Sequence, residues 1–393
     1  MKATGRWKAW LATAVRWSLL LDASVLTLLA LLTAYKCPVW LPWVVGMVVP
    51  EIALWLAPLA LCFAAAAWVL RRRRPVVAGV TIGLCAVSVA LLLKPAVQAR
   101  RLGRELPGQL AAVFGPGEPP RPPFSVGAAL VGRAPEPVPI ESMEYGPGLL
   151  LDFHRAVGRS PAPCVVVIHG GSWVGGNRRD VGTRRELNDW LARRGYAVAS
   201  IDYRLAPQFP WPAQRDDLLA AIAFLHAHAD GLGIDPARLV LLGRSAGAQM
   251  AMAAAYRESV PGIRGVVAIY GPTDFRLTWD DAALPGNIDH RLNLEWFLGG
   301  TPQTAPAAYD SASAVTLVTP AAPPTLILHG ELDVNVFHRQ AELLDRQLGA
   351  AGVPHALVSL PWAAHGFDLV GFNTPGGQVT TYAVDWFLAE VTR

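Results

Sequence analysis

Three long apolar segments near the N-terminus constrain the fold of this chain more than any other feature of its sequence. They are Ser18–Ala34, Ile52–Leu70 and Val76–Leu93. Each approaches the roughly 20 residues that a helix needs to cross the hydrocarbon core of a bilayer. Of the 393 residues, 52% are hydrophobic and only 16% are charged, which also indicates that part of the chain lies in lipid. We therefore predict a multi-pass module in the cell membrane, with about three transmembrane helices over residues 1–110.

A shorter apolar run, Val39–Val49, precedes Pro50 and Glu51. A proline inside a helix kinks it, so this run can extend the second helix across a kink. It can also lie at the membrane interface or conceal a further crossing. Glu51 and Asp22 both lie near expected ends of spans, where water reaches them, so we expect structural or interfacial roles for these two carboxylates.

The distribution of basic residues predicts how this module is oriented. One cluster precedes the first span, and a second, Arg71–Arg74, separates the second span from the third. Because short loops rich in Lys and Arg stay in the cytoplasm, both clusters are expected there. Three crossings then place the C-terminal domain outside the cytoplasm, whereas a fourth would put the two clusters on opposite faces. The basic residues that support this orientation before the first span are Lys2, Arg6, Lys8 and Arg16, and those that oppose it are Lys36, Lys94, Arg100, Arg101 and Arg104.

Charge is divided unevenly along the chain. Residues 1–110 carry 13 Lys and Arg against 3 Asp and Glu, whereas the remaining residues carry 21 against 27. The basic charge therefore belongs to the membrane-flanking segments and does not indicate a surface that binds nucleic acid. The four cysteines have no CxxC or Cys/His spacing, so the sequence predicts neither a nucleic-acid partner nor a metal site.

Proline-rich sequence separates the membrane module from the rest of the chain. Gly115–Pro123 holds five prolines in nine residues, and a second cluster follows at Pro135–Pro139. Such segments act as semi-rigid spacers, so we predict a linker over residues 111–137 and a catalytic domain over residues 138–393.

The catalytic domain alternates short apolar strands with helices, which predicts an α/β fold with a mostly parallel sheet and helices on both faces. In such sheets the active site lies at the carboxyl ends of the strands. Strands are expected at 163–169, 196–203, 238–242, 263–270, 325–329 and 356–360, and helices at 180–194, 213–228, 246–256, 339–351 and 379–391.

Ser245 stands in the pattern Gly243-Arg244-Ser245-Ala246-Gly247, between an expected strand and an expected helix. This context is typical of a nucleophile elbow. The glycines permit a tight turn, and the helix N-terminus directs free N–H groups at negative charge that develops beside the serine. We predict Ser245 as a catalytic nucleophile; the alternative is a plain strand-to-helix turn.

The pattern His169-Gly170-Gly171-Ser172-Trp173 ends an apolar strand upstream of the serine. Hydrolases place oxyanion donors here, because glycines such as Gly170 and Gly171 let backbone N–H groups approach a substrate carbonyl. The N–H of Ala246 is the other expected donor. His169 precedes the nucleophile, so we expect it to brace the loop rather than to act as a base.

Candidates for the acid and the base come later in the chain. Asp333 follows the strand expected at 325–329, and His365 lies in the loop after the next strand. The order Ser, Asp, His is typical of this fold. We expect His365 to take the proton of Ser245 and Asp333 to hold the imidazole tautomer, with Glu331 as the rival acid. The histidines that lack either the loop context or the position after Asp333 are His290, His329, His338 and His355.

These motifs resemble those of the hormone-sensitive-lipase-like and feruloyl-esterase-like α/β-hydrolases. The resemblance covers roughly residues 140–393 and implies hydrolysis of carboxylic esters without a metal or organic cofactor. It also implies loop-bracing, structural roles for Asp202, Arg204 and Asp216. The segments that carry it are His169–Trp173, Ile201–Pro207, Gly243–Gly247, Pro323–Gly330 and Ala364–Phe367.

Two departures from that family keep alternatives open. Ser172-Trp173 stands where many lipase-like members have a third glycine, and a His-Gly-Gly-X-Trp pattern also resembles kynurenine formamidases, which cleave an amide. Ala248 replaces another glycine after the elbow. The leading hypothesis is an esterase or lipase that acts on a small-molecule or lipid ester at the bilayer. The alternatives are arylformamidase-like amide hydrolysis, acyl transfer through the same triad, and a membrane scaffold without enzymatic activity.

Residues 273–320 connect two expected strands by more than a typical loop. We expect this segment to form a cap or pocket wall, and a separate hydrophobic cluster is the alternative. Its large apolar side chains are Phe275, Trp279, Leu284, Trp296 and Phe297.

Overall fold

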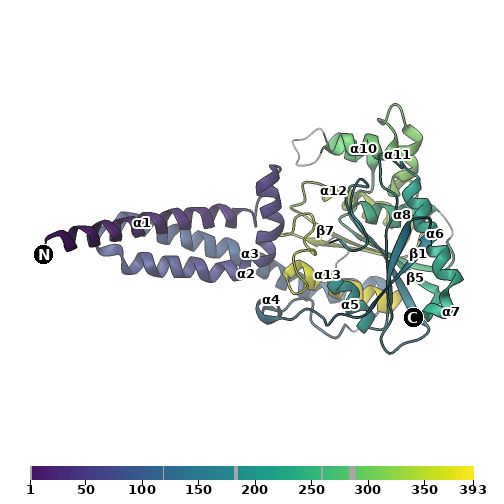
Figure 1. Cartoon of the computed structure of the whole chain (residues 1–393), viewed down its shortest axis with the longest axis horizontal. Helices are drawn as coiled ribbons and strands as arrows, with labels where there is room; N and C mark the ends of the chain where they lie inside the picture. The colour runs from purple at the N-terminus through teal and green to yellow at the C-terminus, as the bar shows by residue number, and fades with distance from the viewer. Residues whose placement is uncertain (1, 118, 181–184, 258–259, 283–288) are drawn as a thin grey trace.

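Three long helices form a bundle that projects from an α/β domain (Figure 1). They are α1 (Lys2–Leu31), α2 (Trp40–Val69) and α3 (Pro75–Phe114). The computed structural model describes residues 2–117, 119–180, 185–257, 260–282 and 289–393. All three helices are long and apolar enough to cross a membrane, in agreement with the number of spans expected from the sequence.

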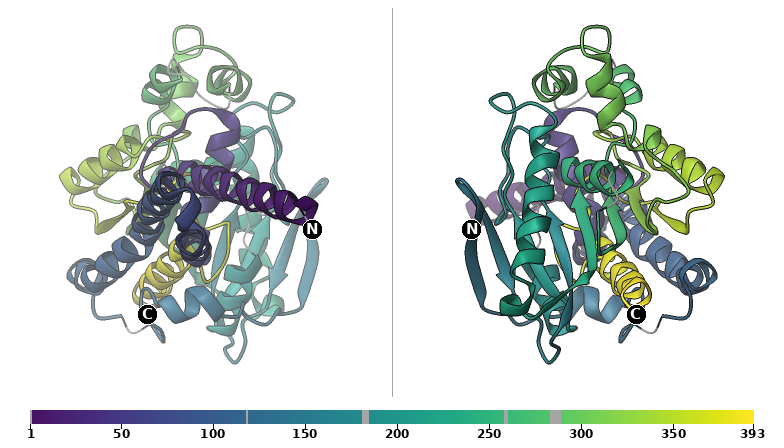
Figure 2. Two further views of the ribbon diagram at one scale, coloured as in Figure 1. Left: turned by 90° about the vertical axis from the view of Figure 1, so that its left-hand side faces the viewer. Right: turned by 90° about the vertical axis from the view of Figure 1, so that its right-hand side faces the viewer.

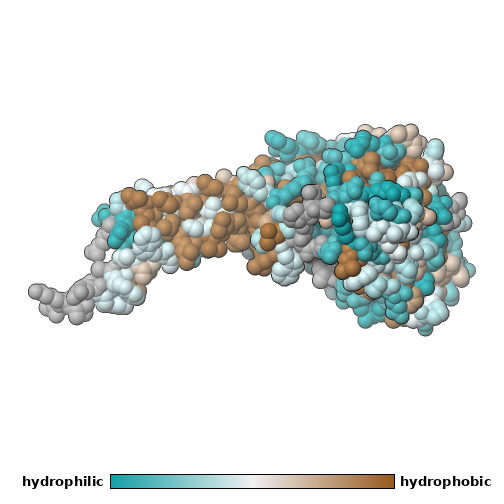
Figure 3. Space-filling view, turned by 90° about the horizontal axis from the view of Figure 1, so that it is seen from above, coloured by the Kyte–Doolittle hydropathy of each residue, from teal (hydrophilic) through white to brown (hydrophobic). Residues whose placement is uncertain are grey.

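Small side chains let the three helices pack closely. Ala23 and Ala30 of α1 and Ala60 of α2 are fully buried in the bundle, where small residues allow helix backbones to approach. Many large apolar side chains of the bundle are exposed, among them Leu28, Trp55 and Val76. Figure 3 shows the hydrophobic surface concentrated on the bundle, whereas the α/β domain is mostly hydrophilic.

The apolar run at 39–49 belongs to the second helix. It forms the first turns of α2, and the helix continues through Pro50 without a break. These turns lie against the α/β domain rather than along the bundle (Figure 1). The run therefore extends the second helix across a proline, as one of the three alternatives anticipated, and adds no separate helix.

Glu51 of α2 joins the bundle to the catalytic domain. Its side chain is buried, with 4% of the residue surface exposed. One carboxylate oxygen accepts a hydrogen bond from the indole N–H of Trp362 at 3.1 Å, and the other accepts one from the backbone N–H of Gly376 at 2.7 Å. Because both donors lie in the catalytic domain, Glu51 has a structural role and fixes α2 in place, but the expectation that water reaches it is wrong, because the side chain is buried between the two parts of the molecule.

The helix α3 is shared between the two parts of the molecule. It runs beyond the third apolar segment to Phe114, and its side chains Ala99, Leu106 and Leu110 are buried in the core of the α/β domain. Gln109 also donates a hydrogen bond to the carbonyl of Leu357 at 2.9 Å. The predicted division near residue 110 therefore falls within a continuous helix, and the division into domains stays a prediction.

An eight-stranded sheet forms the centre of the catalytic domain, in the order β1-β2-β4-β3-β5-β6-β7-β8. The pairs β1–β2 and β2–β4 are antiparallel, and all other neighbours are parallel. The strands are β1 (Ile140–Gly146), β2 (Leu149–His154), β3 (Ala162–Ile168), β4 (Ala197–Ile201), β5 (Ile234–Arg244), β6 (Ile263–Ile269), β7 (Thr325–Gly330) and β8 (His355–Leu360).

Helices cover both faces of this sheet, as expected (Figure 2). Alternate residues of a strand point to opposite faces, so Val166 of β3 packs in one core and Val165 in the other. The helices α6, α8 and α12 lie on the first face, and α5, α13 and the end of α3 lie on the second. The helix bounds are α4 (Val126–Val131), α5 (Arg185–Arg193), α6 (Ala213–Ala227), α7 (Ala229–Leu232), α8 (Ala246–Arg257), α9 (Phe275–Asp281), α10 (His290–Leu298), α11 (Pro306–Ala312), α12 (Arg339–Ala350) and α13 (Pro375–Val391).

The link through Glu51 predicts a loss of stability when its carboxylate is removed. Glu51→Ala leaves the N–H groups of Trp362 and Gly376 buried without an acceptor, at a cost of about 1–3 kcal/mol for each unsatisfied group. We expect the melting temperature of the full chain in detergent to fall by several degrees. Glu105→Ala, which removes an exposed carboxylate from α3, is the control. Equal melting temperatures for the two variants would contradict the structural role of Glu51.

Candidate active site

Ser245 occupies the sharp turn between β5 and α8. Its φ of +53° lies in the left-handed region, which is uncommon for a residue other than glycine. A Cβ at Gly243 would collide with the carbonyl of Gly247, and a Cβ at Gly247 would collide with the carbonyl of Ile168. The turn therefore requires both glycines of the motif, and it raises Ser245 at the carboxyl end of the central strand, where the sequence placed it.

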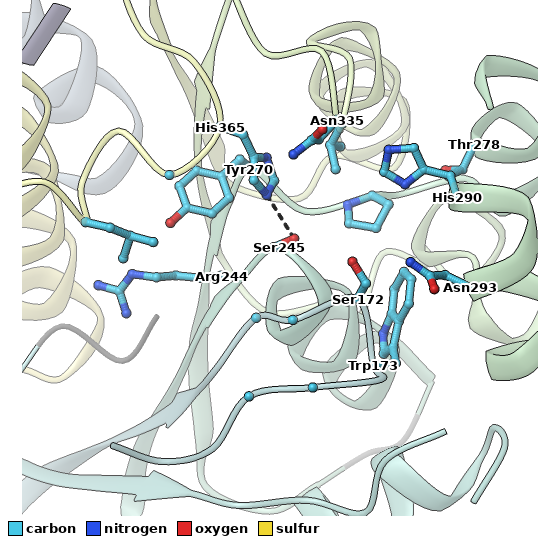
Figure 4. Close-up of a pocket in the computed structure, with 18 of the residues that line it drawn as sticks. Ser172, Trp173, Arg244, Ser245, Tyr270, Thr278, His290, Asn293, Asn335 and His365 are labelled. Carbon is cyan, nitrogen blue, oxygen red and sulfur yellow. Dashed lines mark hydrogen bonds between the residues drawn. The ribbon is translucent and has the colours of Figure 1, made fainter. Parts of the chain in front are cut away.

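A chain of hydrogen bonds joins Ser245, His365 and Asp333. The Nε2 atom of His365 lies 3.1 Å from the Oγ of Ser245, as the dashed line in Figure 4 shows. The other ring nitrogen, Nδ1, lies 2.7 Å from Oδ2 of Asp333. The structure thus brings together the three residues that the sequence analysis selected. Glu331, the rival acid, is not the partner of His365, because Asp333 occupies Nδ1.

Asp333 is fully buried and held by several donors. Its Oδ1 accepts hydrogen bonds from the backbone N–H groups of Asn335 at 2.8 Å and Val336 at 3.0 Å. Burial alone would raise the pKa of Asp333, but the neighbouring His365 and hydrogen bonds from His329 and His365 hold that pKa well below its usual range. A carboxylate in this environment stays ionised and can stabilise a cation on His365.

The loop after β3 approaches the elbow closely. A Cβ at Gly170 would lie 3.2 Å from the Cβ of Ser245, and Gly171 has a φ of +121°. Gly170, Gly171 and Ser172 all line the same pocket as Ser245. Ala246 is the first residue of α8, a position whose N–H has no partner within a helix. The three predicted oxyanion residues therefore surround one side of the serine.

Trp173 holds the loop after β3 in place. It is buried, its indole N–H donates to Oε1 of Gln249 at 3.0 Å, and its ring stacks on Phe297 at a centroid distance of 4.3 Å. Phe275 packs on the same ring at 5.3 Å. Both phenylalanines belong to the segment 273–320, so the aromatic side chains expected in a cap also support the loop that carries Gly170 and Gly171. Leu284 lies outside the described residues.

His169 braces the loop, as expected. Its Nδ1 lies 2.6 Å from the carbonyl oxygen of Gly170, its ring stacks on Tyr203, and burial lowers the pKa of His169. Asp202 also braces it by accepting a hydrogen bond from the N–H of Arg178 at 2.7 Å.

The bracing role predicted for Asp216 is wrong. Asp216 is half-exposed and pairs with its neighbour Arg215. The carboxylate that binds Arg204 belongs instead to the buried Asp217, whose Oδ2 accepts from the backbone N–H of Arg204 at 2.8 Å and whose Oδ1 accepts from the guanidinium at 2.9 Å. Both acids lie in the first turns of α6, and the helical rotation turns Asp217 inward.

A buried ion pair behind the elbow was not predicted. Arg244, with 1% of its surface exposed, donates from Nε to Oδ2 of Asp368 at 2.8 Å. The hydroxyl of Tyr270 donates to Oδ1 of the same carboxylate at 2.6 Å, and the ring of Tyr270 packs against His365 at 4.6 Å. The sequence did contain a signal, because an arginine at the second position of a buried elbow needs a counter-ion.

The pocket above Ser245 has a volume of about 370 Å³, within the range of sites for small molecules. The segment 273–320 contributes Thr278, His290 and Asn293 to its wall, which confirms the expected pocket wall. Of the competing histidines, only His290 lines this pocket, and it is not bonded to Ser245. In the part of the chain that the structure describes, no three His, Cys, Asp or Glu residues are grouped as metal ligands would be.

Comparison with known proteins identifies the family of the catalytic domain. The BD-FAE family model matches residues 151–348, which hold β2 to β7 and the elbow, but not the N-terminal helices. The chain belongs to the BD-FAE family. This membership confirms the α/β-hydrolase fold and the resemblance to hormone-sensitive-lipase-like and feruloyl-esterase-like enzymes.

Two relatives of this BD-FAE protein have names that refer to ester hydrolysis. Esterase LipC of Mycobacterium tuberculosis is 33% identical over 267 residues, which cover 63% of this chain and 64% of LipC. The probable carboxylic ester hydrolase LipM of the same organism is also 33% identical, over 63% of this chain and 59% of LipM. The chain thus matches less than two thirds of the length of either relative. Among solved structures, a bacterial heroin esterase has a TM-score of 0.57 and 26% identity, covering 68% of this chain and 89% of the esterase.

The buried pair behind the elbow predicts a large difference between two aspartates. Asp368→Asn leaves the charge of Arg244 buried and uncompensated, which costs about 3–5 kcal/mol. Asp310→Asn breaks the exposed pair between Asp310 and Arg276, which contributes about 0–1 kcal/mol. Thermal or urea unfolding of the two variants measures the difference. Similar losses of stability would show that the buried pair is not structurally important.

Proposed function

We propose that this protein is a serine hydrolase that cleaves carboxylic esters through Ser245, His365 and Asp333. The observation that carries the proposal is the continuous hydrogen-bonded chain from Asp333 through His365 to a serine raised on a strand–turn–helix elbow. A nucleophile, a base and an orienting acid within hydrogen-bond reach of one another form a recognisable catalytic arrangement.

Acylation begins when Oγ of Ser245 attacks the carbonyl carbon of the ester. Nε2 of His365 takes the serine proton as the Oγ–C bond forms, and the carbonyl oxygen becomes an oxyanion. The tetrahedral intermediate then expels the alcohol, which leaves with the proton from His365. The enzyme is left as an ester on Ser245.

Deacylation repeats these steps with water. His365 takes a proton from water as the water oxygen attacks the acyl carbon, and it returns that proton to Oγ of Ser245 when the carboxylic acid leaves. Asp333 stabilises the imidazolium in both halves because it is buried, ionised and bonded to Nδ1. The net reaction is an ester plus water to an acid plus an alcohol.

The oxyanion is assigned to the backbone N–H groups of Gly170, Gly171 and Ala246. Gly170 and Gly171 line the pocket beside the serine, and Ala246 begins α8, where the helix dipole also favours negative charge. Fixed donors in a buried site need no reorganisation when the charge develops, which is why they lower the barrier.

Esters are preferred over amides as the substrate class. The names of LipC and LipM, the two curated relatives described above, refer to ester hydrolysis. An amide nitrogen is a poorer leaving group, although the His-Gly-Gly-Ser-Trp loop keeps aryl formamides as the competing substrate. No bound cofactor is needed for either reaction.

The proposal predicts hydrolysis by the purified full chain in detergent. It should hydrolyse p-nitrophenyl esters, and Ser245→Ala should lower kcat/KM by several orders of magnitude because the nucleophile is lost. Aryl formamides should be poorer substrates than the esters. Absence of ester hydrolysis, or equal activity of Ser245→Ala, would refute the proposal, and faster cleavage of formamides would move it to amide hydrolysis.

Matched substitutions of Asp333 and Glu331 test which of these two acids belongs to the triad. Asp333→Asn keeps the shape of the side chain but supports the wrong tautomer of His365, a change that costs about 10⁴-fold in kcat in a Ser-His-Asp enzyme. Glu331→Gln should change kcat only a few-fold, because Glu331 does not bond to His365. The reverse order would mean that the acid is Glu331.

We further propose that the bundle spans the cell membrane and that the catalytic domain lies outside the cytoplasm. The N-terminus and the Arg71–Arg73 turn (η1) lie at the end of the bundle far from the catalytic domain (Figure 1). Nε of Arg16 donates to the carbonyl of Leu70 at 3.0 Å, which holds the basic start of α1 beside the end of α2. Both basic clusters therefore favour the same, cytoplasmic side.

Fusion proteins test this orientation in cells. Alkaline phosphatase fused to the C-terminus should be active, because it becomes active only after export. Green fluorescent protein at the same position should be dark, because it becomes fluorescent only when it folds in the cytoplasm. A fusion after Arg74 should give the opposite pattern as an internal control. A bright C-terminal fluorescent fusion would place the catalytic domain in the cytoplasm.

A further inference from the structure

The first turns of α2 form part of the active-site wall. Trp43 and Met47 line the same pocket as Ser245 and His365. The contact is close, since a Cβ added to Gly366, the residue after His365, would lie 2.7 Å from Cε of Met47. A helix from the N-terminal module therefore contributes apolar side chains directly beside the catalytic base.

Glu51 holds this wall in position. Met47 and Glu51 are four residues apart, so they lie on the same face of α2. The carboxylate of Glu51 bonds to Trp362, three residues before His365, and to Gly376. Met47 is therefore packed against the pocket by a buried polar anchor one helical turn away, and its contact is a fixed feature of the site.

The other face of these turns is apolar and exposed. Leu41 and Val48, seven residues apart and so on the same side of the helix, are 62% and 37% exposed. Apolar surface of this kind, on a helix that continues into a membrane-length segment, is covered by lipid in a bilayer-bound protein. One face of the segment thus lies towards lipid and the other towards the reacting serine.

The cap, residues 273–320, contributes polar side chains to another wall of the pocket. Thr278, His290 and Asn293 lie together on one side of Ser245 (Figure 4). Nε2 of His290 is buried and has no hydrogen-bond partner among the described residues, and burial lowers the pKa of His290, so the ring is neutral. A buried polar atom of this kind on a pocket wall can bind a polar group of a ligand.

We infer that the natural substrate is a single-chain amphiphilic ester dissolved in the membrane, with its acyl chain against Trp43 and Met47 and its polar alcohol part under His290 and Asn293. This inference rests on the proposed ester hydrolysis. The volume of about 370 Å³ suits one chain and a small head group. The ester carbonyl then lies between the two walls, at Ser245.

Acyl-chain selectivity tests the apolar wall. Met47→Trp fills the space beside His365 and should lower the ratio of kcat/KM for p-nitrophenyl octanoate to that for p-nitrophenyl acetate at least tenfold. Met47→Ala opens the same space and should shift the preferred chain length upwards. Val48→Trp, on the exposed face, should leave the ratio within twofold of the wild type.

Polar selectivity tests the cap. Asn293→Leu removes a polar group from the wall, and it should lower the ratio of kcat/KM for 1-octanoylglycerol to that for ethyl octanoate at least fivefold. Both substrates share the acyl chain, so the ratio reports on the alcohol part alone.

The outcomes separate this inference from the proposed function. If both Met47 variants keep the wild-type chain-length profile while Ser245→Ala is inactive, the triad stands and α2 is not the acyl wall. If Asn293→Leu keeps the glycerol preference, the cap does not bind the alcohol part. If the wild type hydrolyses none of these esters, the proposed function itself fails.

Discussion

A buried carboxylate on a membrane-length helix sets the arrangement of the whole molecule. Glu51 accepts hydrogen bonds from Trp362 and Gly376, which flank the loop that carries His365. A buried charge or acceptor is costly to leave without partners, so α2 cannot move from the catalytic domain without losing both bonds. The N-terminal helices are therefore part of the catalytic unit rather than a tether at the end of a linker.

The same contact connects the bundle to the chemistry. The loop held by Trp362 carries His365, and the next turn carries Asp368, which binds Arg244 of the elbow and Tyr270 beside the imidazole. The strained turn at Ser245 is thus supported from below by the sheet and from behind by this ion pair. Preorganisation of this kind holds a serine, a histidine and an acid within hydrogen-bond distance without bound substrate.

Much of this arrangement could be predicted because it depends on local sequence. The elbow needs glycine at 243 and 247. The parallel strands contain continuous apolar runs such as Val165–Ile168 and Leu239–Leu242, and Ser245, Asp333 and His365 occur in the order typical of this fold. The two strands β1 and β2 were not predicted. β1 lies at the sheet edge and has only one buried residue among its seven, so it lacks the apolar alternation that marks a half-buried strand.

The tertiary partners of individual side chains could not be predicted from the sequence either. The pairing of Arg204 with Asp217 instead of Asp216 depends on which residue the helix turns inward, and the pairing of Arg244 with Asp368 joins segments 124 residues apart. The position of Met47 beside Gly366 depends on the path of α2 through Pro50. Three alternatives were open for this run, and composition alone could not decide between them.

The most direct test is an experimental structure of the full chain after reaction with p-nitrophenyl octylphosphonate, which leaves a phosphonyl group and its octyl chain on an activated nucleophile. The account predicts phosphorus bonded to Oγ of Ser245, its oxygen facing the N–H groups of Gly171 and Ala246, and the octyl chain lying along Met47 of α2. A chain directed away from α2, or an adduct on another residue, would contradict it.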